Sequence, residues 1–104
     1  MTIQFNADNN LTVHEGFREK LSGQLTDQLS RFDEYITRLE VHLSDENGEK
    51  HGKDDKKCLL EARVKNKQPV VVTAFGATYE LAVSDAAVKL KKTLNSLVEK
   101  MHSH

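Results

Sequence analysis

Apolar residues in the last third of the chain recur at the spacing of an α-helix. From residue 79 to residue 101 they fall three or four positions apart and form one continuous face, made of Tyr79, Val83, Ala86, Ala87, Leu90, Leu94, Leu97, Val98 and Met101. Such a face is typical of an amphipathic helix that packs on an apolar surface. Thr78 is suited to cap this helix, because its hydroxyl can accept a hydrogen bond from a backbone N–H of the first turn.

Four shorter stretches alternate between apolar and polar residues, which is the pattern of half-buried β-strands. They cover residues 2–6, 36–43, 58–65 and 69–75. The side chains predicted to face the core are Ile3, Phe5, Leu39, Val41, Leu43, Leu60, Ala62, Val64, Val70, Val72 and Ala74. Each stretch has one such row, so we expect only one face of the sheet to be fully covered.

A second helical pattern spans residues 12–35, with Phe17, Leu21, Leu25, Leu29 and Phe32 at helical spacing. Thr12 and Glu15 at its start fit a capping box. The element order is therefore β-α-β-β-β-α. This order predicts an α+β fold, a two-layer sandwich in which two helices pack on one face of a four-stranded sheet.

The 104 residues are enough for one compact domain, so we expect residues 1–104 to fold as one unit. Residues 44–57 contain no apolar side chain and mix acidic with basic residues, which predicts a mobile loop. Residues 102–104 are expected to form a frayed tail.

Composition limits the classes of function. The net charge of −1 gives no overall field toward nucleic acid or an anionic membrane, so such binding would need a local patch. The single cysteine, Cys58, allows no internal disulfide, which fits a reducing cytoplasm. The sequence shows no signal peptide and no stretch that could span a membrane, so we expect a cytoplasmic protein.

The candidate metal ligands and catalytic groups are weak. His42, His51 and Cys58 match no zinc-binding spacing, and surface histidines with a thiol at a sheet edge are the simpler interpretation. The chain has no phosphate-binding loop, no dinucleotide-binding glycine pattern, and no nucleophile beside a base on adjacent elements. We therefore expect a protein that is not an enzyme and that uses no metal, cofactor or small-molecule substrate.

Basic residues carry more information. Lys89, Lys92 and Lys100 share one flank of the last helix, and Lys91 lies on the opposite flank. Further basic residues occur on the first helix and on the third strand with its turn, namely Lys20, Arg31, Arg63, Lys65 and Lys67. A line of lysines can neutralise RNA phosphates without reading sequence. The alternative is that these lysines only solvate the helix.

Several segments resemble the ribosome hibernation-promoting factors, also called ribosome-associated translation inhibitors or ribosomal subunit interface proteins. They are IQFNADNNLTV followed by EGFR, the join FDEYITRLEVHL, and VVVTAFGATYELAVSDAAVKL. The resemblance covers nearly the whole chain. It lies in the order and spacing of these segments rather than in any one motif.

The resemblance implies the same β-α-β-β-β-α fold and a place on the small ribosomal subunit, in the channel used by messenger and transfer RNA near the decoding region. Family members silence idle ribosomes there, and they contact ribosomal RNA through basic residues of both helices and nearby strand ends. Carried over by position, this implicates Arg18, Lys89, Lys92 and Lys100. The chain is less basic than the family pattern and has Glu34 and Tyr35 at the join before the second strand.

Together, pattern and resemblance predict a small-subunit-binding protein that inhibits translation or promotes hibernation by contacting ribosomal RNA. The residues predicted to bind RNA are Arg18, Lys20, Arg31, Arg63, Lys65, Lys89, Lys91, Lys92 and Lys100. The alternative is a diverged protein-interaction module of the same fold with weak or no RNA binding. In that case the acidic face of the first helix (Glu15, Glu19 and Asp33), together with Leu81 and Val88, would contact a protein. A continuous positive surface across the last helix and the third strand would favour the ribosome, and a broken one would favour the alternative.

Overall fold

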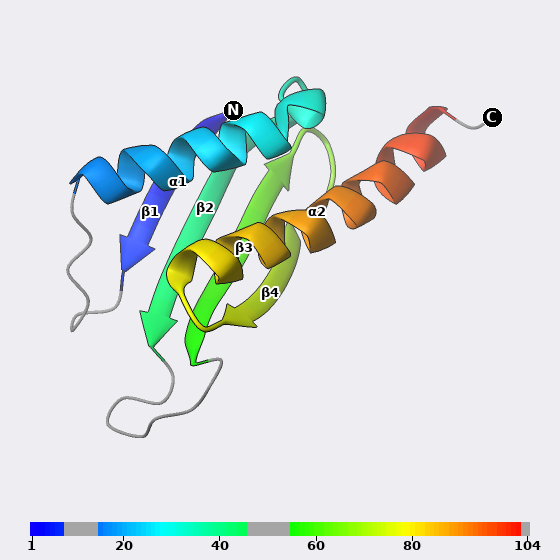
Figure 1. Ribbon diagram of the computed structural model, residues 1–104. Helices are drawn as coiled ribbons and strands as arrows, with labels where there is room; N and C mark the ends of the chain where they lie inside the picture. Colours follow the sequence, from blue (N-terminus) through cyan, green and yellow to red (C-terminus); the bar gives the residue numbers. More distant parts are fainter. Residues whose placement is uncertain (8–14, 46–54, 103–104) are drawn as a thin grey trace.

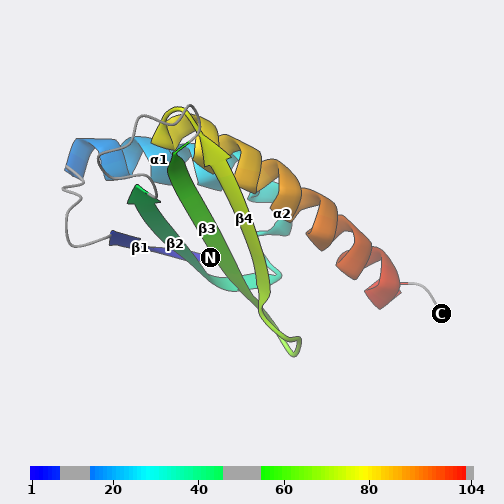
Figure 2. The same cartoon turned by 90° about the horizontal axis from the view of Figure 1, so that it is seen from below.

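The computed structural model describes residues 1–7, 15–45 and 55–102. Four strands form one sheet in the order β1-β2-β3-β4, and two helices cover one of its faces (Figures 1 and 2). The elements are β1 (Thr2–Ala7), α1 (Glu15–Gln28), the short 3-10 helix η1 (Ser30–Phe32), β2 (Ile36–Asp45), β3 (Lys56–Val64), β4 (Val70–Gly76) and α2 (Tyr79–His102). The predicted α+β fold with its β-α-β-β-β-α order is confirmed.

The sheet is mixed. β1 pairs with β2 in parallel, with Ile3 opposite Leu39, whereas β2–β3 and β3–β4 are antiparallel. A parallel pair needs a long crossover, and α1 supplies it between β1 and β2. Both edge strands, β1 and β4, therefore have one neighbour each.

One hydrophobic core fills the space between the sheet and the helices. The predicted rows Leu39, Val41, Leu43 and Leu60, Ala62, Val64 are buried, and so are the helix residues Leu21, Leu25, Leu29, Val83, Leu90 and Leu94. Ile3, Phe5, Val70 and Val72 on the edge strands are partly buried against the same core. The opposite side of the sheet, which no helix covers, is called the open face below.

The start of α2 is fixed by two local features. The backbone N–H of Leu81 donates to Thr78 Oγ1 at 3.1 Å, so the predicted cap is confirmed. A Cβ at Gly76 would lie 2.8 Å from the backbone nitrogen of Ala82, which is closer than real Cβ atoms approach. Glycine is therefore required where β4 turns into α2.

Two boundaries differ from the prediction. The first helix ends at Gln28, and the short η1 carries the chain to Phe32, while Thr12 lies outside the described residues. The expected loop at 44–57 is shorter, because both of its ends extend β2 and β3. Lys56 Nζ lies 2.9 Å from Asp45 Oδ2 across these strands, so an ion pair supports strands that have no apolar residues there. Residues 46–54 of that loop, and residues 103–104 of the expected tail, lie outside the described residues.

The interpretation of Cys58 as a thiol at the sheet edge is wrong. Cys58 is fully buried in the inner strand β3, between Leu43 of β2 and Ala74 of β4. It shares the inward side of that strand with Leu60 and Ala62, because alternate residues face the same way. Burial raises the pKa of its thiol to about 12.

Candidate nucleic-acid interface

The exposed flank of α2 carries three of the predicted RNA-binding residues. Lys89, Lys92 and Lys100 are all exposed along this one uninterrupted helix. Lys92 and Lys100 have no ion pair with any described residue. Lys91 is half-buried on the opposite flank. The structure thus keeps the predicted line of charge but leaves Lys91 outside it.

Lys89 is held by the sheet. Its Nζ donates a hydrogen bond to the backbone carbonyl oxygen of Thr73 in β4, at 2.7 Å. The ammonium is therefore fixed beside the edge strand rather than extended into solvent. This contact joins residues 16 positions apart, and helical spacing gives no sign of it.

Several basic residues without ion pairs come from segments at one end of the sheet. Lys65 follows β3 and its N–H bonds to the carbonyl of Tyr35, just after η1, so the β3–β4 turn and η1 meet there. The C-terminal half of α2 projects from the same end (Figures 1 and 2). We call this the basic end, made of Arg31, Lys65, Lys67, Lys92 and Lys100. Each of these side chains is exposed, and none forms an ion pair with a described residue. Arg31 also lies over the ring of Phe32, 5.3 Å from its centre.

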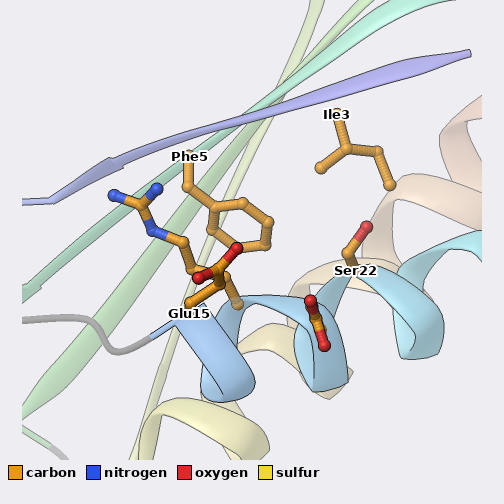
Figure 3. A pocket seen from close by; sticks show the side chains of 6 residues that line it. Ile3, Phe5, Glu15 and Ser22 are labelled. Atoms are coloured by element: carbon orange, nitrogen blue, oxygen red, sulfur yellow. The ribbon is translucent and has the colours of Figure 1, made fainter.

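The basic residues of α1 lie in different surroundings. Lys20 forms an ion pair with Glu80 of α2 at 3.2 Å, so its charge is largely balanced. Arg18 lines an open groove of about 370 Å³ between α1 and β1, and no described residue pairs with it. The floor of the groove is Ile3 and Phe5 of β1, which point toward α1, where Glu15 lies (Figure 3). Neither residue joins the basic end.

Arg63 is on the open face, opposite the helices. Its Nε lies 3.5 Å from Glu40, and its guanidinium lies 3.3 Å from Glu61. Arg38 also contacts Glu40, at 3.0 Å, and His42 lies 4.0 Å from it. The expected positive surface shared by the last helix and the third strand is therefore broken at Arg63, which belongs to a charge-balanced cluster, and on this point the structure favours the protein-interaction alternative. Strand alternation could have revealed this, since Arg63 lies between the inward Ala62 and Val64.

This cluster gives stability a dependence on pH. Hydrogen bonding from Arg38, followed by the nearby charges of Arg38 and Arg63, lowers the pKa of Glu40 below its ordinary value of 4.5. A carboxyl group with a lowered pKa stabilises the folded state above its ordinary pKa, and this contribution is lost as pH falls through the lowered value.

We expect Glu40→Gln to reduce the free energy of unfolding at pH 7 and to lose this effect as pH falls below 4.5. Urea denaturation of both proteins from pH 7 to pH 3 measures the difference. Glu99→Gln is the matched control, because Glu99 is exposed and has no partner among the described residues. A difference that stays constant over this range would contradict the assignment.

Two absences apply to the described part of the chain. No group of three or more His, Cys, Asp or Glu side chains there could hold a metal ion. None of the helices described combines the length and apolar character that a membrane span requires.

Comparisons with known proteins give a family match from the sequence and a fold match from solved structures. A family model described as "Sigma 54 modulation protein / S30EA ribosomal protein" matches residues 3–102. The N-terminal domain of Protein Y from Thermus thermophilus superposes with a TM-score of 0.71 and 18% identity, over 93% of this chain and 99% of that one. A ribosomal subunit interface protein from Coxiella burnetii gives a TM-score of 0.74 and 13% identity, over 93% and 97%. No curated protein sequence matches this chain.

Proposed function

Because the chain belongs to the Sigma 54 modulation protein / S30EA ribosomal protein family, we propose that it binds the small ribosomal subunit and inhibits translation there. The family resemblance expected from the sequence is confirmed by that match. The site of binding is the channel for messenger and transfer RNA, and the outcome is ribosome hibernation. The protein acts in the cytoplasm, by binding rather than catalysis.

The observation that carries this proposal is the basic end. Five exposed cations from η1, the β3–β4 turn and α2 lie there without acidic partners among the described residues. Each can contact an RNA phosphate without first breaking an ion pair, and such contacts position a protein on RNA regardless of sequence. Lys20 and Arg63 already have carboxylate partners, so they contribute less.

Inhibition would follow because the bound protein fills the RNA channel. The folded body measures 51 × 25 × 20 Å, and its two helices and sheet share one packed core. A rigid body held in the channel by phosphate contacts excludes any RNA that would use the same space. No bond is made or broken, so inhibition is reversible and competitive with messenger and transfer RNA.

We expect the protein to co-sediment with purified small subunits at low salt and to dissociate steeply as salt is raised. Each phosphate contact releases counterions, so four or five contacts predict a slope of log K against log salt of roughly −3 to −4. Prior loading of the subunits with messenger and transfer RNA should block binding.

A lack of co-sedimentation even at low salt would contradict the proposal. The result would then favour a protein-interaction module, for which the exposed Leu81 and Val88 are the specific observation. They are 54% and 45% exposed and lie seven residues apart on the outer side of α2.

A further inference from the structure

The edge strand β4 has the sequence of a strand that is buried on both sides. Its helix side carries Val70, Val72 and Ala74, and its open face carries Val71 and Phe75, which are 54% and 47% exposed. Continuous apolar runs are typical of strands inside a sheet. The other edge strand, β1, has only polar residues on the open face, namely Thr2, Gln4 and Asn6. The open-face side chains of β1 are thus polar, as expected for an edge strand, whereas β4 exposes the apolar Val71 and Phe75 there.

The backbone of β4 is also oriented for a further neighbour. Lys89 reaches the carbonyl of Thr73 from outside the sheet. In an antiparallel ladder the N–H and C=O of one residue point to the same side, and this side alternates along the strand. Since the carbonyl of Thr73 accepts from Lys89, alternation implies that Val71, Thr73 and Phe75 direct their backbone groups outward, and that Val70, Val72 and Ala74 direct theirs toward β3. Such an edge is a template for another strand.

Helix α2 extends the apolar surface past this edge. Both views show its C-terminal half continuing beyond β4 on the helix side (Figures 1 and 2). On that half, Leu97, Val98 and Met101 continue the face of the buried Leu90 and Leu94 but are themselves only half-buried. A strand added to β4 would place its helix-side residues against this part of α2.

The charge around the edge is mostly positive, with Asp85 on α2 as an exposed acidic neighbour of Lys89 along the helix and Glu61 of β3, opposite Val71, paired with Arg63. Lys65 and Lys67 precede β4, Lys89 lies beside its centre, and Lys92 follows on α2, all without a carboxylate partner among the described residues. A second copy of the chain would bring its own lysines against these, so like charges oppose self-pairing. Acidic side chains flanking an apolar strand would instead be attracted.

We propose that β4 accepts an extended segment of a protein partner as a fifth strand of the sheet, with alternating apolar residues flanked by acidic ones. Backbone hydrogen bonds to Val71, Thr73 and Phe75 would give affinity, and the apolar and basic surroundings would select the sequence. The ammonium of Lys89 would compete with the incoming strand, because that strand must share or replace the hydrogen bond from Lys89 to the Thr73 carbonyl. This inference goes beyond ribosome binding, and its test uses no ribosome.

The probe is the synthetic peptide acetyl-EEVTVTVEE-amide, added to the full chain labelled with 15N. We expect it to slow amide hydrogen exchange at Val71, Thr73 and Phe75 by at least about tenfold, because these N–H groups become part of a ladder. The comparison peptides acetyl-KKVTVTVKK-amide and acetyl-EEVPVPVEE-amide should not do so, since one reverses the charge and the other cannot form a strand.

Two variants at one position separate backbone pairing from charge. Thr73→Pro removes an outward N–H, leaves the ladder to β3 and does not change the net charge, whereas Thr73→Val keeps the N–H. We expect the proline variant to lose at least about tenfold in peptide affinity and the valine variant to bind like the wild type. If the proline variant fails to fold, the proposal is tested by hydrogen exchange at the three amides of the wild type, measured with and without the peptide.

Three results would overturn the proposal. They are unchanged exchange at Val71, Thr73 and Phe75 at saturating peptide, equal binding by a folded Thr73→Pro variant, and stronger protection of the same amides by a uridine decamer. The last result would make β4 part of an RNA surface. Ribosome binding remains a separate measurement, so either proposal can fail alone.

Discussion

Reversing two charges at the basic end, with Lys92→Glu and Lys100→Glu, is expected to abolish co-sedimentation with the small subunit while the fold is retained. Both side chains are exposed on α2 and lack an ion pair with any described residue. Glutamate is as good a helix former as lysine, so far-UV circular dichroism should not change. Two attractive contacts with phosphate become repulsive, and affinity should fall by more than about tenfold at physiological salt.

The control for this variant is Lys50→Glu with Lys53→Glu, which gives the same net charge through substitutions in the segment between β2 and β3 in the sequence. It should reduce binding much less. Lys89 is left out of the variant because its ammonium bonds the Thr73 carbonyl, and its reversal would disturb β4 as well. Loss of binding in the control and retention in the helix variant would mean that the basic end is not the docking surface.

Leu90→Ala is expected to destabilise the folded state by about 2–5 kcal/mol, because it removes most of a fully buried side chain and leaves a cavity. Leu90 lies at the centre of the α2 face that covers the sheet. Lys92→Ala on the exposed side of the helix should change the free energy of unfolding by less than about 0.5 kcal/mol.

Denaturant titration of the two variants measures this difference. It is informative because α2 obtains most of its stability from packing rather than from intrinsic helix propensity. Similar small effects for both substitutions would show that the buried face of α2 has been misassigned.

Periodicity predicted the parts of the fold that depend on local pattern. The rows at Leu39–Leu43 and Leu60–Val64 and the face of α2 came out as expected, because one buried side forces one repeat along the chain. The Thr78 cap was likewise visible, since its partner is only three residues away. Fold class followed from element order.

Other features were missed where partners are distant in sequence or where residue type misled. The polar ends of β2 and β3 have the composition of a loop, although Asp45 and Lys56 pair across the sheet. Strand alternation places Cys58 on the same side as Leu60 and Ala62, so its burial follows from the sequence pattern. The sequence shows the charge of each lysine and the side of the helix on which it lies, but it does not show which groups the lysine contacts. The contacts of Lys20 with Glu80 and of Lys89 with Thr73 exist only once the chain is folded.

The burial of the Cys58 thiol should control how fast it reacts with alkylating reagents. With a pKa of about 12, only about one molecule in ten thousand carries the thiolate at pH 8, and the core shields even that fraction from reagents. Alkylation must then wait for an opening that separates β3 from its neighbours. The labelling rate of the single cysteine therefore reports how often the sheet opens around β3.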